Sequence, residues 1–176
     1  MIEGLLLHYP TYSSDFSYEA YFETEDLLEE LSMKIPALVK ADLVIAPEGM
    51  NGLIVIDLRD NPLSNVREKE FKRNFNKKLE EGKAQGYWKY IAKPVFFNRI
   101  INSKISEIAA AVKNLKEKIK GKWRIKINTR HRIPRRETIE EVAKHITYPV
   151  DLENPKYIVK IECLGKISGV AVEIGK

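Results

Sequence analysis

The sequence predicts a mixed α/β (α+β) fold built from two parts. Short apolar runs typical of strands alternate with helical patterns along the chain. A polar stretch with two glycines, residues 81–86, lies between two such series and suits a linker. At 176 residues the chain can form one ordinary domain or two small ones, and 44% hydrophobic residues supply a core. We therefore expect one domain over residues 1–86 and a second over residues 87–176.

The first part is expected to follow a βαββα order. Its strand and helix signals come at residues 2–9, 18–33, 43–45, 53–56 and 66–82. The two central strands are joined by residues 47–52, where an Asn-Gly pair suits a hairpin-like turn. The last helix has a thin apolar stripe, Phe71, Phe75 and Leu79, and basic residues on its other faces. This order predicts a small sheet with helices on one side.

The second part is expected to be a mixed series as well. Its signals are an extended segment at 90–97, a helix at 103–121, a strand at 122–127, and strands at 157–163 and 167–174. Ser103 is the expected N-cap of the helix and Gly121 the residue just beyond its end. Residues 138–141 have the spacing of a capping box and are expected to open a further helix.

Catalytic signatures are absent from the sequence. It has no dinucleotide, nucleotide-phosphate or S-adenosylmethionine loop and no nucleophile elbow. The three histidines lie far apart and Cys163 is the only cysteine, which argues against a metal site. The apolar side of its strand predicts that Cys163 is a buried hydrophobe, and Glu137, Glu140 and Glu141 suit the start of a helix. We expect no catalytic residue, no metal and no cofactor.

The charge is unevenly distributed. Residues 1–60 hold three Lys/Arg and twelve Asp/Glu, a net of −9, and residues 61–176 hold 27 and 13, a net of +14. This predicts an acidic part joined to a basic part that binds a polyanion. The alternative is that charged faces solvate a heat-stable protein, since 31% charged residues and a single glutamine are typical of thermophiles.

The strongest binding signal is a run of cations after residue 121. Alternation along 122–127 places Trp123, Ile125 and Ile127 on the core side and three cations on the other. A basic loop follows directly. The candidate RNA-binding residues are Lys122, Arg124, Lys126, Arg130, His131, Arg132, Arg135 and Arg136. Such a strand face and loop suit salt-dependent contacts with an unpaired RNA end, although the cations could instead pair with acids of the neighbouring helix. Trp123 is expected in the core, and Trp88 remains open as a base-stacking platform.

The C-terminal sequence resembles the THUMP domain, an RNA-binding module of tRNA-modification enzymes. The resemblance lies in the strand ending in Thr129-Arg130, the helix, the segment Val150-Asp151-Leu152-Glu153-Asn154-Pro155 and the last strand with Gly169-Val170-Ala171-Val172. It covers about residues 87–175, and residues 1–86 look like the ferredoxin-like domain that often precedes THUMP. Arg130 falls on the family's Thr-Arg position. Asp151, Asn154 and Pro155 match the motif too, but a turn-forming role suits them better than RNA contact.

The resemblance implies recognition of the 3′ acceptor end of tRNA. With no catalytic segment after the last strand, the layout looks like stand-alone THUMP adaptors that serve a tRNA cytidine acetyltransferase making N4-acetylcytidine. We therefore expect a non-catalytic tRNA-binding adaptor in the cytoplasm, because neither a signal peptide nor an apolar span is evident and a lone cysteine fits a reducing compartment. Two alternatives stay open: an RNA-binding subunit of a split thiolation or methylation enzyme, and a protein-interaction module that uses the acidic first sixty residues. Binding of helix 66–82 to anionic lipid is a more distant one.

Overall fold

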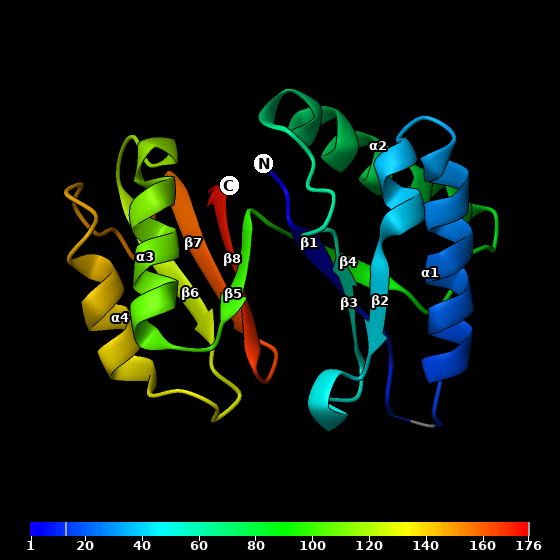
Figure 1. The fold of residues 1–176 in the computed structure, drawn as a ribbon, viewed down its shortest axis with the longest axis horizontal. Helices are drawn as coiled ribbons and strands as arrows, with labels where there is room; N and C mark the ends of the chain where they lie inside the picture. Colours follow the sequence, from blue (N-terminus) through cyan, green and yellow to red (C-terminus); the bar gives the residue numbers. More distant parts are fainter. Residues whose placement is uncertain (13, 176) are drawn as a thin grey trace. The chain divides into compact units, whose positions relative to one another are not determined.

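The computed structural model describes residues 1–12 and 14–175, with only the backbone at positions 65 and 66. The chain divides into two compact units, Met1–Phe97 and Asn98–Lys176, each with its own sheet and its own core. Figure 1 shows the elements of each unit. Within the described residues, no helix has the length and apolar character needed to cross a membrane.

The first unit is a ferredoxin-like βαββαβ fold. Its elements are β1 (Gly4–His8), α1 (Ser17–Ser32), a 3-10 helix (Pro36–Lys40), β2 (Asp42–Ile45), a 3-10 turn (Pro47–Gly49), β3 (Leu53–Asp57), α2 (Asn65–Ala84) and β4 (Ala92–Phe97). The strand order is β2-β3-β1-β4, and every neighbouring pair is antiparallel. The turn between β2 and β3 contains Gly52 at φ +85°, where a Cβ would come within 3.1 Å of the Tyr9 carbonyl oxygen. That close approach explains the predicted Asn-Gly turn.

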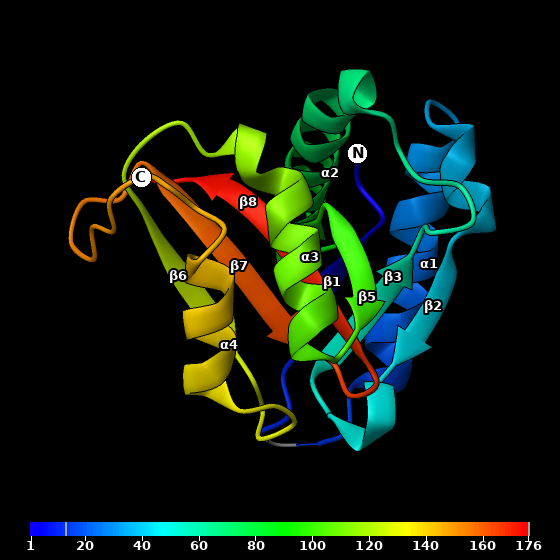
Figure 2. The same ribbon diagram turned by 60° about the vertical axis from the view of Figure 1, so that its left-hand side comes forward.

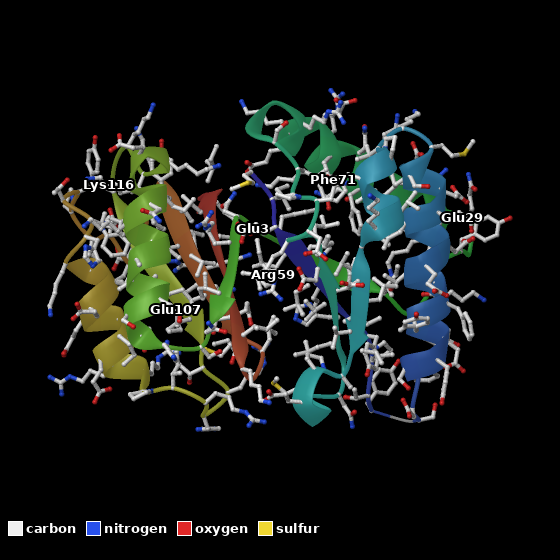
Figure 3. All side chains as sticks on the ribbon, in the orientation of Figure 1. Glu3, Glu29, Arg59, Phe71, Glu107 and Lys116 are labelled. Atoms are coloured by element: carbon white, nitrogen blue, oxygen red, sulfur yellow. The ribbon has the colours of Figure 1, made fainter. Side chains whose placement is uncertain are left out.

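Helices α1 and α2 pack on one face of this sheet. The expected stripe of α2 is buried, and Phe71 and Phe75 each meet Phe96 of β4 edge to face, with ring centroids 5.7 and 5.5 Å apart. Figure 3 labels Phe71 on α2. β4 is therefore part of the first core and not only an added edge.

The structure of residues 81–97 differs from the organisation predicted from the sequence. The stretch predicted as a linker is largely helical, since α2 continues to Ala84. Gly82 serves close packing, because a Cβ there would lie 2.0 Å from the Trp88 ring. Trp88 is buried, and its Nε1 donates to Asp26 Oδ2 at 3.0 Å. The structure thus divides the chain after Phe97, whereas the sequence had suggested residue 86.

The second unit has two helices on one face of a four-stranded mixed sheet. Its elements are β5 (Arg99–Asn102), α3 (Ile105–Leu115), a 3-10 turn (Lys116–Lys118), β6 (Trp123–Asn128), α4 (Arg135–Ala143), β7 (Tyr157–Cys163) and β8 (Ile167–Ile174). The order is β5-β8-β7-β6, with β6 and β7 parallel and the other pairs antiparallel. Figure 2 shows α3 and α4 lying across this sheet. Val112, Val142, Val159 and Val172 belong to the core between the two layers.

Both expected helix starts of this unit are wrong. α3 begins at Ile105, and the Ser103 hydroxyl instead bonds to the Ser168 hydroxyl at 2.7 Å. Glu107 in the first turn accepts from the Asn102 main-chain nitrogen at 3.1 Å (Figure 3). α4 begins at Arg135, so Thr138 lies inside it and donates to the Pro134 carbonyl oxygen at 2.6 Å. The capping-box spacing was therefore coincidental.

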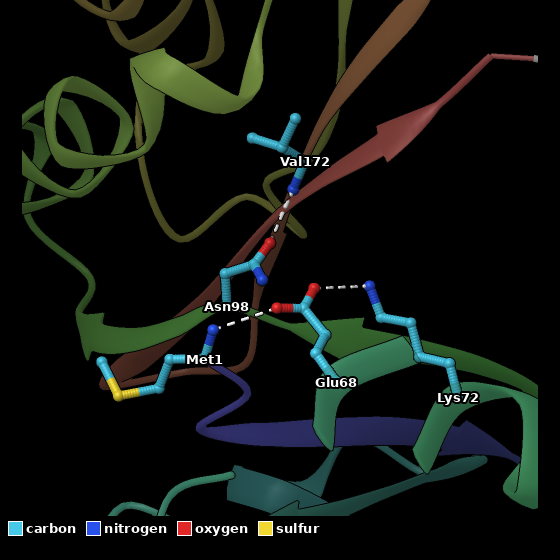
Figure 4. A network of polar contacts seen from close by, with 5 residues as sticks. All are labelled: Met1, Glu68, Lys72, Asn98 and Val172. Atoms are coloured by element: carbon cyan, nitrogen blue, oxygen red, sulfur yellow. Dashed lines mark hydrogen bonds and ion pairs between the residues drawn. The ribbon is translucent and has the colours of Figure 1, made fainter. Parts of the chain in front are cut away.

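Three polar contacts, two in the first unit and one in the second, hold chain segments in place (Figure 4). In the first unit the mostly buried Glu68 carboxylate accepts hydrogen bonds from the N-terminal amine of Met1 at 3.0 Å and from Lys72 Nζ at 2.9 Å. In the second unit the buried Asn98 side-chain oxygen accepts from the Val172 main-chain nitrogen at 3.0 Å. Each buried polar group thereby has partners, as burial requires.

Candidate RNA-binding surface

Strand β6 separates its apolar and basic side chains as predicted. Trp123 and Ile127 are buried in the core under α3 and α4, and Ile125 packs against it. Trp123 Nε1 also donates to the Tyr148 carbonyl oxygen at 2.7 Å. Since Trp123 and Trp88 are both buried and hydrogen-bonded, neither is presented as a stacking platform.

The face of β6 away from the helices carries Arg124 and Lys126. The parallel register places Lys126 beside Lys160 of β7. Lys160 was not among the candidate residues predicted from the sequence. These three cations line a shallow hollow of about 290 Å³, together with Glu153 and Glu173. Lys160 pairs with Glu173 at 2.8 Å, whereas Lys126 is exposed and makes no ion pair among the described residues. Because the pairing of β6 with β7 places Lys160 here, this residue could be predicted only if that pairing were known.

Arg124 is held more tightly than its neighbour. Its Nη1 donates to the Leu152 carbonyl oxygen at 3.2 Å, and its Nε is buried with no hydrogen-bond partner in the described part of the chain. A buried donor without a partner costs free energy, so it is the rest of the guanidinium, which lines the hollow, that can meet a phosphate oxygen. Lys122, at the start of the strand, instead pairs with Asp151 at 3.0 Å.

The loop between β6 and α4 is fixed by Arg130, within the loop, and by Arg135, the first residue of α4. Arg130 Nη1 donates to the Cys163 carbonyl oxygen at 2.8 Å, and its Nη2 lies 2.8 Å from Glu162 Oε2. Arg135 Nη1 donates to the Ile127 carbonyl oxygen at 2.6 Å. Arg130 and His131 adopt φ values of +46° and +60°, a left-handed conformation that side chains rarely take without such support.

Three further candidate residues, in the loop and in the first turn of α4, are exposed. His131, Arg132 and Arg136 all lie on the surface, and Arg136 pairs only with Glu140 one turn along α4, at 2.8 Å and with 88% of its side chain exposed. Such an exposed pair contributes little to stability. The eight candidate residues, seven cations and His131, therefore differ in exposure and in their contacts. Lys122, Arg130 and Arg135 make contacts within the unit, and Lys122 and Arg135 are exposed as well. Lys126, His131, Arg132 and Arg136 are exposed, and Arg124 is partly buried.

The segment after α4 forms the turn that the sequence analysis assigned to it. Asp151 Oδ1 accepts from the main-chain nitrogens of Glu153 at 3.1 Å and Asn154 at 2.9 Å. These hydrogen bonds, led by that from Asn154, and the Lys122 ammonium hold the pKa of Asp151 below its usual value. Asp151 thus shapes a turn, in agreement with the prediction.

Cys163 is buried, as predicted. Its sulfur accepts from the Ser168 hydroxyl at 3.4 Å, and burial raises the pKa of the thiol. In the described residues, no three His, Cys, Asp or Glu side chains come together as they would to hold a metal ion.

Comparison with known proteins gives a likeness of fold. No family model and no curated protein sequence matches the chain. The solved structure of PH1313 from Pyrococcus horikoshii Ot3 has a TM-score of 0.62 at 12% identity, over 98% of this chain and 54% of that one. A 4-thiouridine synthetase, solved in complex with RNA and with bound ATP, has a TM-score of 0.52 at 13% identity, over 98% and 41%. The chain thus spans about half of these proteins or less.

The strand orders and this likeness together confirm the expected fold class, a mixed α+β chain with a ferredoxin-like unit followed by a unit of THUMP-like fold. At these identities the likeness concerns the fold alone.

Proposed function

We propose that this protein binds tRNA through its second unit, recognises the unpaired 3′ acceptor end, and presents the tRNA to a separate modification enzyme. The observation that carries the proposal is a difference among the basic residues of β6 and the segment after it. Some of them hold the backbone in place, and others are exposed. Arg130 and Arg135 hold the loop to the sheet through main-chain acceptors. Lys126 on β6, Arg132 in the loop and Arg136 in the first turn of α4 are exposed.

The charge of this unit supports an RNA partner. Residues 98–176 hold 18 Lys/Arg and nine Asp/Glu, a net of +9. Clustered arginines suit phosphate groups, because the planar guanidinium can donate two parallel hydrogen bonds. A strand face with an adjoining loop suits an unpaired end, whereas the deep groove of an RNA helix excludes side chains. The fold likeness to a synthetase solved with RNA is in keeping with this partner class.

The remaining parts of the proposal rest on the THUMP resemblance. We propose that the chain itself is not an enzyme, and that the enzyme it serves is a tRNA N4-cytidine acetyltransferase. Co-purification of the tagged protein from its own cells, followed by nucleoside analysis of tRNA from a deletion strain, tests this part. Loss of N4-acetylcytidine would support the acetylation adaptor, and loss of a thiolated or methylated nucleoside would instead assign the protein to a split enzyme.

RNA binding is tested first by fluorescence anisotropy with full-length tRNA across a salt series. The variant Lys126→Ala/Arg132→Ala/Arg136→Ala removes three exposed cations of the proposed surface. Its matched control, Lys113→Ala/Lys116→Ala/Lys120→Ala, removes three exposed cations on and after α3. We expect the first variant to lose about ten-fold or more in affinity, and the plot of log K against log salt to flatten by about one per lost contact.

The control variant is expected to change affinity less than three-fold, since its net charge falls equally but its cations lie elsewhere. Equal losses in both variants would contradict a defined surface and leave only bulk charge attraction. Trimming the unpaired 3′ end of the tRNA should weaken binding to the wild type, and indifference to trimming would remove the acceptor-end assignment.

A further inference from the structure

The first unit contains a groove that the proposed RNA binding does not use. It lies between α1, the 3-10 helix Pro36–Lys40 and β2, and has a volume of about 590 Å³. Its floor is apolar, with Leu28 and Leu38 almost fully buried and Leu43 partly so. Its rim carries Glu25, Glu29 and Asp42, and no Lys or Arg side chain is among the described residues that line it.

Among the described residues, none of the three rim carboxylates has an ion-pair partner. α1 holds six acids and no Lys or Arg. Three of them have internal roles: Glu23 accepts from the main chain at 89–91, Asp26 accepts from Trp88, and Glu30 pairs with Lys78. In contrast, Glu29 and Asp42 make no ion pair within the part of the chain that the structure describes, and Glu25 interacts with the Tyr21 hydroxyl.

The position of Glu29 adds an electrostatic cost. It lies in the last turn of α1, where the helix dipole is negative and no basic side chain offsets it. A cation bound beside this turn would offset the negative end of the helix dipole and the negative charge of the rim carboxylates. The groove therefore favours a positively charged occupant, and it opposes RNA, whose phosphates the same carboxylates repel.

The wall formed by β2 offers main-chain hydrogen bonds as well. β2 is the end strand of its sheet, and among the described residues it pairs with β3 alone. The Ala46 nitrogen bonds to the Leu53 carbonyl oxygen at 2.8 Å, so by antiparallel alternation Val44 and Asp42 also bond toward β3. The N–H and C=O groups of Leu43 and Ile45 consequently point to the open edge, where an added strand would meet them.

From these features we infer that the groove binds an extended, Lys/Arg-bearing segment of a partner protein as an added strand on β2. The aliphatic stem of a Lys or Arg side chain would cover Leu28 and Leu38, and its charged head would reach Glu25 and Glu29. A second copy of this chain fits less well, because pairing β2 with β2 would bring two acidic rims together. The inference is independent of the proposed RNA binding, which uses the other unit.

The probe for this site is a fluorescein-labelled peptide of alternating arginine and valine, seven residues long, titrated with the full chain by anisotropy. The variant Glu25→Gln/Glu29→Gln/Asp42→Asn removes the rim charge with nearly unchanged shape. Its matched control is Asp60→Asn/Glu70→Gln/Glu80→Gln, which neutralises three exposed acids of the same unit outside the groove. We expect at least a ten-fold loss in the groove variant and less than a two-fold loss in the control.

Two further measurements separate strand addition from general charge attraction. N-methylation of alternate peptide amides should abolish binding in one of the two possible patterns and spare it in the other, since only one set faces β2. Amide shifts on peptide addition should centre on residues 42–45. Equal losses in the two triple variants, insensitivity to N-methylation, or a dimer in sedimentation that the groove variant disperses would each overturn the inference. Unchanged tRNA affinity in the groove variant is expected and keeps this test separate from that of RNA binding.

Discussion

At the scale of single residues, side chains of one type perform different tasks on the candidate surface. Arg130 and Arg136 both belong to the basic stretch after β6. Arg130 has only 17% of its side chain exposed and contacts Glu162 and the Cys163 carbonyl, whereas Arg136 is 88% exposed. The sequence reveals how many cations lie here, but which of them are turned inward depends on acceptors in β7, about thirty residues later.

Replacement of Arg130 is therefore expected to act through stability. Arg130→Ala leaves the mostly buried Glu162 without its cation and the loop without an anchor, which should lower the free energy of unfolding by about 1–3 kcal/mol. Arg136→Ala should change it by less than about 0.5 kcal/mol. Urea denaturation of both variants measures the difference. If the two losses were the same, Arg130 would not be a positioning residue.

Cys163 should make stability fall at alkaline pH. Burial raises the pKa of its thiol above the usual 9.0, and the unfolded chain therefore loses the thiol proton at a lower pH than the folded chain does. Between the two pKa values the folded state binds more protons, so the free energy of unfolding declines as pH rises from about 9. The variant Cys163→Ala lacks this term, and its stability relative to wild type should improve over that range. A difference that stays constant from pH 7 to 10.5 in chemical denaturation would contradict the assignment.

At the scale of elements, the apolar pattern of the sequence predicts a strand correctly where that strand is buried in the sheet. The pattern fails where a segment is very short or lies between two elements. β7 and β8 were predicted with the bounds they have, because β7 alternates regularly, β8 is a nearly continuous buried run, and a glycine turn joins them. β5 was missed: it has four residues and no pattern of its own. The domain boundary was displaced because the two glycines at 82 and 86 look like a linker, although one of them packs against Trp88 within α2.

The role of β4 leads to a prediction about fragments. A fragment of residues 1–97 contains the whole βαββαβ order, including Phe96 between Phe71 and Phe75. A fragment of residues 1–86 lacks Trp88, Ile91 and Phe96, all of which belong to the core. We expect dispersed amide resonances and a cooperative thermal transition for the longer fragment and neither for the shorter one. Cooperative folding of the shorter fragment would restore the boundary that the sequence suggested.

At the scale of the whole molecule, the fold redistributes the charge that the sequence divides. The first sixty residues are strongly acidic, but the unit they belong to also contains the basic helix α2. Residues 1–97 hold twelve Lys/Arg and sixteen Asp/Glu, a net of −4, against +9 for residues 98–176. The difference in net charge between the two units is therefore smaller than the difference between residues 1–60 and 61–176. The reason is that β4 pairs with β1 and α2 packs on the same sheet, so both belong to the acidic unit.

This distribution predicts where tRNA affinity resides. If the exposed cations of the second unit make the phosphate contacts, a fragment of residues 98–176 should bind tRNA with a salt dependence close to that of the full chain. The slope of log K against log salt should agree within about one, because each phosphate contact contributes roughly 0.7–0.9 to it. The fragment of residues 1–97 serves as the control and should bind at least ten-fold more weakly. A steep slope that appears only in the full chain would show that the cations of α2 contact the RNA too, and the surface would then have to include the first unit.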